Sequence, residues 1–317
     1  MSTEDRSRGW LLSGASGLLG AALYQALAAQ SKTVVRLVRG ASDGIHGSVA
    51  WNPATAPPIA DFSVLEGLRV AVHLSGANVG ARRWTAAYQR ELTESRVATT
   101  RALALMLAEL RQPPEVLVVA SAVGIYGNRG DELLDENSAP GAGFLADLCR
   151  TWEAEADPAR QAGIRVVHAR LGVILAPLGG ALAKMLPVFR LGLGGPLASG
   201  QQWMSWIALD DAVRAIQFAA ATPSISGPVN FVAPEPVRNA EFTRLLAQLL
   251  HRPTVFRTPG WALKLAFGQM AQETLLSSQR GNPAVLKSAG FQFRYENARE
   301  ALESALECDP QVKSALS

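Results

Sequence analysis

The chain has 317 residues, of which 48% are hydrophobic, and a formal net charge of +3. Because this charge excess is small and no Lys/Arg block stands out, we expect neither a nucleic-acid site nor a polybasic membrane site. Cys149 and Cys308 lie far apart and the four histidines are scattered, so we expect no disulfide framework and no metal site. No apolar run reaches the ~20 residues of a membrane span, and residues 1–8 are polar, unlike a signal peptide. We therefore expect a soluble cytoplasmic protein.

A glycine-rich turn near the N-terminus lies between a predicted strand and a predicted helix. Residues 10–12 form a short apolar run, residues 21–29 are good helix formers, and Gly14, Gly17 and Gly20 lie between them at a spacing of three. In this context the first glycine permits a tight turn, the second lets the backbone approach a pyrophosphate, and the third lets helix and strand pack closely. The helix N-terminus offers N–H groups to phosphates. We predict a dinucleotide site; the alternative is a glycine-rich turn without a ligand.

The next predicted strand, residues 33–38, ends at Arg39 with no acidic residue beside it. In dinucleotide-binding folds an acidic residue at this point binds the ribose 2′-hydroxyl of NAD, whereas an arginine accommodates the 2′-phosphate of NADP. We therefore favour NADP(H) over NAD(H). The alternative is a solvated surface arginine.

Strands and helices alternate over the rest of the N-terminal half. Strands are predicted at 48–51, 68–74, 115–120 and 163–170, and a long helix at about 85–110 is ended by Pro113 and Pro114. Such alternation predicts a parallel, doubly wound Rossmann-type α/β sheet. We expect this domain to span residues 8–176, with its sheet completed by later segments around 205–233.

The composition of the chain and its predicted elements change after about residue 177. Residues 191–196 are too rich in glycine for regular structure, while helices are predicted at about 212–221 and 241–250 and a strand at 227–232. Asp210 and Asp211 precede the first of these helices and are expected to act at least partly as its N-terminal cap and dipole partner. We expect residues 177–317 to form a smaller C-terminal α/β substrate lobe.

The glycine pattern, Arg39, the turn at 74–77 and Ser121 with Tyr126-Gly127 together resemble the extended short-chain dehydrogenase/reductase superfamily. The atypical, epimerase-like branch, some members of which are labelled cell-division inhibitors, is similar over nearly the whole chain. The matching stretches are 83–84, 94–96, 124–127, 148–153, 170–175, 184–196 and 206–207. The closing segment from about residue 252 resembles this branch's own C-terminal extension.

The resemblance implies a Rossmann domain, a smaller substrate lobe and a bound nicotinamide cofactor, most consistent with NADP(H). It implies that Gly14, Gly17, Leu18 and Leu19 hold the pyrophosphate. Val38 and Arg39 would meet the adenosine phosphate, and Leu74 and Ser75 would line the ribose and adenine side. It also implies that Glu91 and Arg96, on the long helix, face the cofactor and that Val173 lies near its nicotinamide end. The expected cofactor set is completed by Ser16, Gly76 and Ser121.

The catalytic unit of ordinary members of the superfamily is missing. Their Tyr-x-x-x-Lys pair lies on one helix face, where the lysine lowers the tyrosine pKa for proton transfer. Registering the helix on Glu153 puts Leu145 at the tyrosine position and Cys149 at the lysine position. The usual Ser/Thr position holds Ala122, and Arg96 stands where an asparagine is usual.

Three functional hypotheses follow. The first is an oxidoreductase with a relocated proton donor, for which the candidates are Tyr126, Ser121 or a water held by Arg96. The second is a sensor or regulator that binds NADP(H) without turnover. The third, an ordinary sugar-nucleotide epimerase or dehydratase, is disfavoured by the missing pair. The substrate is an unidentified small molecule, the catalytic residues are unassigned, and the protein is expected to be a monomer or homodimer.

Overall fold

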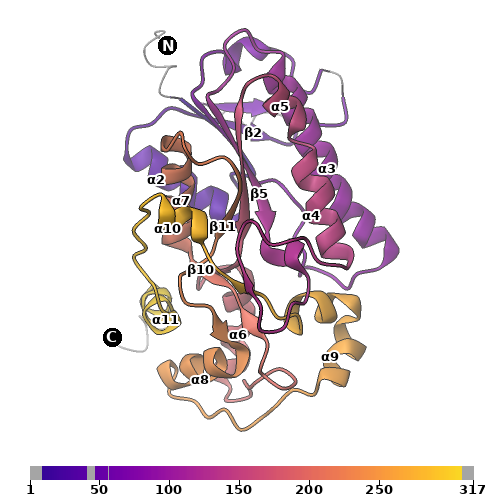
Figure 1. The fold of residues 1–317 in the computed structure, drawn as a ribbon, viewed down its shortest axis with the longest axis vertical. Coiled ribbons are helices and arrows are strands. Elements are labelled where there is room, and N and C mark those ends of the chain that lie inside the picture. Colours follow the sequence, from indigo (N-terminus) through magenta and orange to yellow (C-terminus); the bar gives the residue numbers. More distant parts are fainter. Residues whose placement is uncertain (1–8, 41–46, 56, 309–317) are drawn as a thin grey trace.

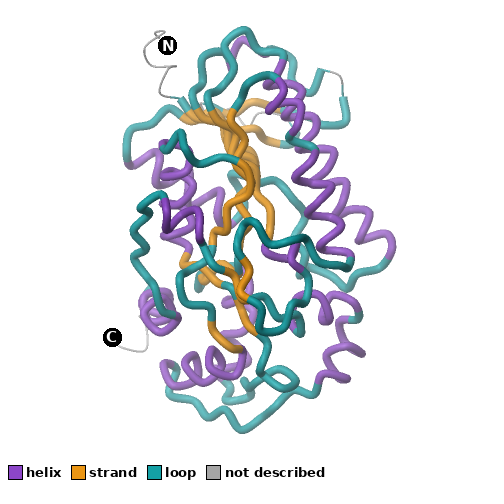
Figure 2. The backbone as a smooth tube through the Cα atoms, viewed as in Figure 1, coloured by secondary structure: helices purple, strands orange, loops and turns teal. Residues whose placement is uncertain are grey.

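The computed structural model describes residues 9–40, 47–55 and 57–308. The expectation about a signal peptide concerns residues 1–8 and falls outside the described residues. Within the described part, a parallel sheet forms the centre of the molecule (Figure 2). It has seven strands in the order β11-β7-β5-β4-β1-β2-β3. Its strands are β1 (Trp10–Ser13), β2 (Val34–Val38), β3 (Ser48–Ala50), β4 (Val70–His73), β5 (Val116–Ala122), β7 (Arg165–Leu171) and β11 (Gly227–Phe231).

Helices cover both faces of this sheet (Figure 1). One face carries α2 (Leu18–Ala29), α7 (Leu209–Ala221) and α10 (Ala284–Ser288), and the other carries α3 (Ala86–Ala108), α4 (Phe144–Ala154) and α5 (Asp157–Gln161). Successive strand residues alternate between the two cores: Leu12 and Val72 pack on the α2 side, and Leu11 on the α3 side. Burial on both faces explains why these strands are continuous apolar runs.

A third apolar core defines what we call the C-terminal lobe. It is formed by α6 (Gly180–Arg190), α8 (Asn239–Leu249), α11 (Ala298–Glu307) and the short strands β8 (Val173–Leu175), β9 (Trp203–Met204), β10 (Trp206–Ala208) and β12 (Val237–Arg238). β10 pairs with β8, and β12 pairs with β9. Trp206 is fully buried and packs within this core.

The remaining elements are short. They are the 3-10 turns η1 (Phe62–Leu65) and η2 (Val123–Tyr126), β6 (Leu133–Leu134) paired with β13 (Arg280–Gly281), α9 (Gly260–Phe267) and a π-helical turn, η3 (Ala271–Leu275). None of the helices in the described residues is long and apolar enough to cross a membrane.

The Rossmann-type fold predicted from the sequence is confirmed. Each strand of the central sheet lies where an apolar run predicts one, within two residues at either end. The cap prediction for α7 is wrong in part: the helix begins at Leu209, its N-cap is Ala208, and no side chain caps it. Asp211 instead accepts backbone N–H bonds from Arg294 and Tyr295, although both aspartates do lie in the first helical turn.

Candidate functional site

The three glycines of the N-terminal turn differ in whether packing requires a glycine at that position. Gly14 has φ +74°, and a Cβ there would lie 2.7 Å from the carbonyl of Leu74. A Cβ on Gly20 would lie 2.1 Å from the carbonyl oxygen of Gly14, so α2 packs directly on the turn. Gly17 has an ordinary φ of −78°, is exposed, and its Cβ would meet only the Gly14 oxygen, at 3.4 Å. Packing therefore requires Gly14 and Gly20 to be glycine, but it does not require this of Gly17.

A buried hydrogen-bond chain lies directly beneath this turn. The Ser13 hydroxyl and His73 Nδ1 are 2.5 Å apart, and His73 Nε2 lies 3.2 Å from the Thr99 hydroxyl. Burial lowers the pKa of His73 to about 3, so the imidazole is neutral at physiological pH. The chain ties the ends of β1 and β4 to α3 and so fixes the edge of the sheet on which a ligand would lie.

Arg39 follows β2 and is exposed beside a cavity of about 590 Å³. Most of the lining comes from the segment after β3: Arg39, Gly40, Ala50, Trp51, Asn52, Pro53, Thr55, Pro57, Pro58, Ile59 and Ala60. None of these lining residues is acidic. Val38 is half-buried at the end of the strand.

The turn after β4 is anchored to α3 by Arg96. Its Nη2 donates to the Ala77 carbonyl at 2.9 Å, its Nη1 donates to the Leu92 carbonyl at 3.1 Å, and its guanidinium lies over the Trp152 ring. A Cβ on Gly76 would lie 3.1 Å from this guanidinium. Arg96 therefore holds the backbone of the turn in place, and two of its nitrogens are already engaged.

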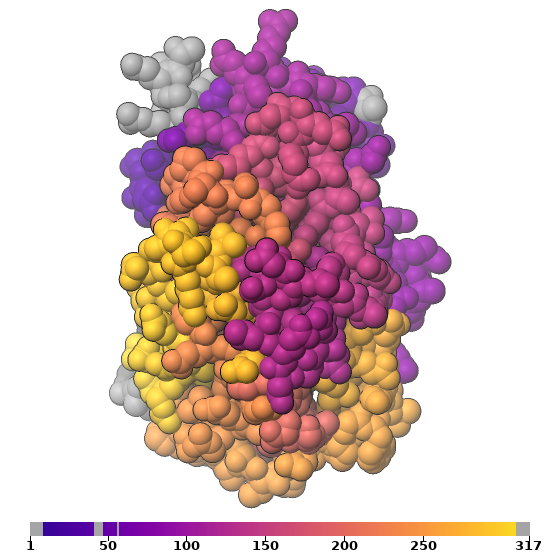
Figure 3. Space-filling model, viewed as in Figure 1, coloured from indigo at the N-terminus to yellow at the C-terminus, as the bar shows by residue number. Residues whose placement is uncertain are grey.

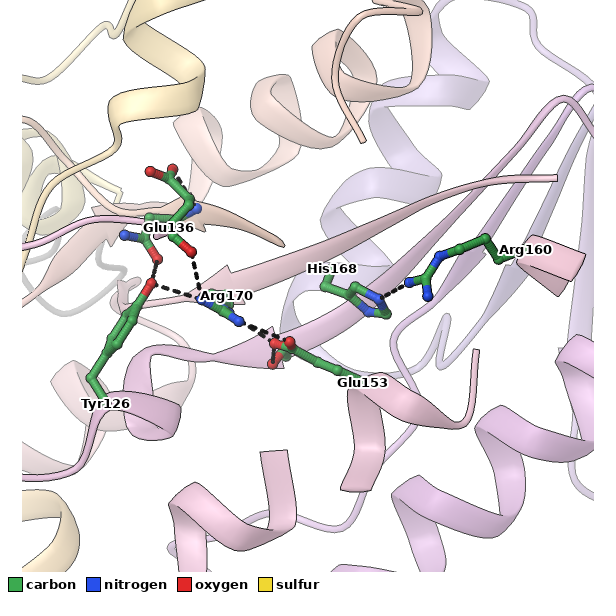
Figure 4. Close-up of polar contacts among 8 residues, drawn as sticks. Tyr126, Glu136, Glu153, Arg160, His168 and Arg170 are labelled. Carbon is green, nitrogen blue, oxygen red and sulfur yellow. Dashed lines mark hydrogen bonds and ion pairs between the residues drawn. The ribbon is translucent and has the colours of Figure 1, made fainter. Parts of the chain in front are cut away.

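The carboxyl end of β5 leads into a buried polar network (Figure 4). The Ser121 hydroxyl donates to Glu153 Oε1 at 2.6 Å, and Arg170 binds both Glu153 oxygens, at 2.9 and 3.0 Å. Burial works against the charged guanidinium, but the hydrogen bonds and charge of Glu153 outweigh it and raise the pKa of Arg170. Ser121 is thus held by the carboxylate of α4.

Tyr126 lies at the other end of the same network. Its hydroxyl donates to Asn230 Oδ1 at 2.7 Å and accepts from Arg170 at 3.0 Å, and the side chain is fully buried. Burial raises the pKa of Tyr126 against the opposing effect of Arg170. The tyrosine therefore packs and bonds within the interior.

Two members of the network had no signal in the sequence. Asn230 also donates from Nδ2 to the Leu134 and Asn282 carbonyls. Oε1 of Glu136 accepts the backbone N–H groups of Asn230 and Val285. These partners lie about 50 to 150 residues apart in the chain, so neither spacing nor a local motif points to them.

Comparison with known proteins assigns the chain to a family. The profile of the NAD dependent epimerase/dehydratase family matches residues 10–231, and a domain of unknown function, DUF1731, matches residues 258–305. An epimerase family protein of Mycobacterium tuberculosis (strain CDC 1551 / Oshkosh) is 46% identical over 294 residues, 92% of this chain and 95% of the relative. This chain belongs to the NAD dependent epimerase/dehydratase family. The predicted resemblance is thereby confirmed, including the separate C-terminal segment.

Two further relatives share a more specific name. The chloroplastic epimerase family protein SDR39U1 homolog of Arabidopsis thaliana is 37% identical over 307 residues, 93% of this chain and 86% of the relative. The crystal structure of human epimerase family protein SDR39U1 (isoform 2) with NADPH has a TM-score of 0.84 at 31% identity and covers 95% of this chain and 99% of that chain. The similarity to both extends over the sheet domain and the lobe.

Leu145 and Cys149 stand at the positions of the missing Tyr and Lys in this epimerase-family chain. Both lie on α4, beside η2. Leu145 packs 3.4 Å from where a Cβ on Gly124 would lie. Cys149 is buried, and burial together with the charge of Glu153 raises the pKa of its thiol to about 12. Neither side chain is able to donate or accept a proton as a Tyr–Lys couple does.

Sheet topology brings most of the predicted cofactor residues together. β2, β1, β4 and β5 are neighbours, so their carboxyl ends form one edge. That edge carries the residues of the glycine turn and three strand ends: Gly14, Ser16, Gly17, Leu18, Leu19, Val38, Arg39, Leu74, Ser75, Gly76 and Ser121. Leu18 contacts the start of α6, within 2.9 Å of a Cβ built on Gly179. Val173 begins β8, within the lobe.

Glu91 lies apart from that set. It is half-exposed on α3 and pairs with Arg82 at 3.6 Å. Its role toward a cofactor stays a prediction, as do the roles assigned to the other residues.

Proposed function

We propose that this chain binds NADP(H) across the carboxyl edge of the sheet, with the pyrophosphate over the glycine turn. The observation that carries the proposal is Gly17: its backbone is ordinary and its surroundings leave room for a Cβ, so packing does not explain the glycine. Close approach of a pyrophosphate to the backbone does explain it. The NADPH in the human relative supports the same reading.

The phosphate of the adenosine ribose is the proposed ligand of Arg39. Arg39 is exposed and lines the 590 Å³ cavity, whose described lining offers no acid for a free 2′-hydroxyl. A planar guanidinium binds phosphate through paired N–H groups. We therefore favour NADP(H) over NAD(H).

The proposed chemistry follows from which interior side chains have a proton free to donate. A bound nicotinamide supplies or accepts a hydride. Ser121 and Tyr126 already donate their protons to Glu153 and Asn230, and the Cys149 thiol stays protonated at neutral pH. We infer an oxidoreductase whose substrate proton, where one is needed, comes from water or from the substrate. The residues of this chain bind and orient the reactants.

An NADP(H)-binding sensor without turnover is the second candidate. The open Gly17 favours this candidate equally, because it concerns cofactor binding and not the missing Tyr–Lys pair. The glycine turn and the Arg39 cavity are both present. NADPH deuterated at C4 separates the two. After incubation with a metabolite extract, an oxidoreductase transfers deuterium to a product detectable by mass spectrometry, whereas a sensor binds NADPH and leaves the label in place.

The binding proposal is tested by titrating NADPH and NADH into the wild type, Arg39→Ala and Arg111→Ala. Arg111 is equally exposed but lies outside the cavity lining. We expect the wild type and Arg111→Ala to bind NADPH at least tenfold more tightly than NADH, since a charge-assisted phosphate contact contributes about 1.5–3 kcal/mol. Arg39→Ala removes that difference. Equal affinities for both cofactors in the wild type contradict the assignment of Arg39.

A further inference from the structure

Large exposed apolar side chains gather in two segments of the C-terminal half, residues 191–193 and 255–265. The most exposed are Leu191 (74%), Leu193 (53%), Val255 (75%), Phe256 (54%), Trp261 (71%) and Leu265 (71%). Figure 1 shows the segment that joins α8 to α9 at the end of the long axis opposite β2, and Figure 3 shows it as a rounded end. We call these six residues the apolar end face.

Two chain segments run side by side over part of this face. Leu197 bridges Thr258, and a Cβ on Gly192 would contact the Pro253 ring at 3.6 Å. Gly195 lies against the Phe256 carbonyl, so only glycine fits there. This register places residues 191–193 beside 253–256. Trp261 and Leu265 follow at a spacing of four and therefore share one side of α9.

The charged residues within the two segments that form this face have a single sign. Residues 178–209 and 242–272 contain no Asp or Glu. Arg252, Arg257 and Lys264 lie within the same segments and are exposed. A surface that combines protruding Trp, Phe and Leu with Lys and Arg, and lacks acids, matches an anionic lipid interface, where apolar side chains enter the acyl boundary and cations meet headgroups.

We propose that the apolar end face docks the protein on an anionic lipid bilayer. Contiguous exposed apolar patches mark interaction sites. A second copy of the chain is a poorer occupant, since an isologous contact would bring the same acid-free basic segments of both copies together. The sequence holds no contiguous Lys/Arg block because the basic side chains come from separate positions along α9 and the loop before it.

The test is co-sedimentation of the full chain with vesicles of phosphatidylcholine alone and with about 30% phosphatidylglycerol, enough anionic lipid to create a negative surface potential. The variants are Trp261→Ser/Leu265→Ser and Arg257→Glu/Lys264→Glu. Matched controls are Leu133→Ser, which is 55% exposed on β6, and Arg111→Glu, which is exposed in the turn between α3 and β5. Thermal unfolding and light scattering of every variant separate loss of binding from loss of fold or a change of oligomeric state.

We expect the wild type and both controls to bind the anionic vesicles and to be released by salt. The apolar double variant loses roughly tenfold or more of its partition coefficient, and the charge-reversal variant loses about fivefold per cation. Absence of wild-type binding, or equal binding by folded end-face variants, overturns the proposal. It is equally overturned if the variants change only the oligomeric state, which identifies the face as an interface between copies.

Discussion

At the level of single residues, the glycine turn separates packing from ligand binding. Gly14 and Gly20 are required because any side chain would collide with backbone, at 2.7 Å and 2.1 Å, respectively. Gly17 meets no such obstacle. A spacing of three glycines in sequence does not distinguish these roles, since the distinction depends on how β4 and α2 approach the turn.

Gly20→Ala is expected to destabilise the fold by about 1–3 kcal/mol, because its Cβ forces α2 away from the Gly14 carbonyl. Gly17→Ala, in the same turn, changes the free energy of unfolding by less than about 1 kcal/mol. Urea denaturation of both variants provides the comparison. Equal losses of stability in the two variants argue against these separate roles in the turn.

The buried His73 makes stability depend on pH. Its folded pKa of about 3 lies below the unfolded value of 6.5, so its neutral form is fully favourable above pH 6.5 and that contribution is lost as the pH falls toward 3. Between about pH 6.5 and 5 the wild type is expected to lose about 1.4 kcal/mol per pH unit more than His73→Asn. Urea unfolding across this range measures the slope. His251→Asn, an exposed control, keeps the wild-type slope; a wild-type slope in His73→Asn contradicts the assignment.

At the level of secondary structure, one ion pair holds several elements in register. Arg170 at the end of β7 binds Glu153 of α4 and Tyr126 of η2, while Glu153 accepts from Ser121 of β5. Both charged side chains are largely buried, at 7% and 13% exposed. Breaking one partner of such a pair leaves an uncompensated charge in the interior.

Arg170→Met is therefore expected to destabilise the protein by about 3–5 kcal/mol. Adding Glu153→Gln removes the stranded charge and recovers part of that loss, because a neutral amide oxygen still accepts from Ser121. Arg150→Met, which breaks an exposed ion pair with Asp147 on the same helix, costs less than about 1 kcal/mol. Denaturant midpoints rank the variants, and a double variant no more stable than Arg170→Met disagrees with this network.

The strands were predictable from sequence but this network was not. Residues 116–119 of β5 are buried on both faces of the sheet, and a continuous apolar run is the sequence pattern of that environment. Arg170 lies near the end of β7, and its partners lie 17 and 44 residues away in the chain. Contacts between such distant positions depend on tertiary packing. Local patterns predicted the sheet edge of the candidate site, but not that the network binds the hydroxyls of Ser121 and Tyr126.

At the level of the whole molecule, the C-terminal segment caps a helix of the sheet domain. The N-cap of α4 is Gly143, which has no side chain to cap the helix. Glu273, in the π-helical turn after α9, supplies the cap instead: its carboxylate accepts from the backbone N–H groups of Phe144 and Leu145 at 3.1 and 2.8 Å. The DUF1731 segment thus supports the helix that carries Glu153.

Glu273→Ala is expected to lower the free energy of unfolding by about 1–2 kcal/mol through loss of this cap and of its charge at the helix N-terminus. Glu296→Ala, at an exposed position in a loop, serves as the control with a change within about 0.5 kcal/mol. Both are measured by urea unfolding. A Glu273→Ala protein as stable as its control shows that α4 does not depend on the C-terminal segment.

The proposed dinucleotide site depends above all on Gly17 being open to a pyrophosphate, and calorimetry tests this dependence. NADPH binding is measured on the wild type and on Gly17→Ala, after unfolding shows that the two are equally stable. We expect Gly17→Ala to keep its fold and to bind NADPH at least roughly tenfold more weakly, because the added methyl occupies the line of approach. Unchanged NADPH affinity in a folded Gly17→Ala protein would show that no pyrophosphate lies over this glycine.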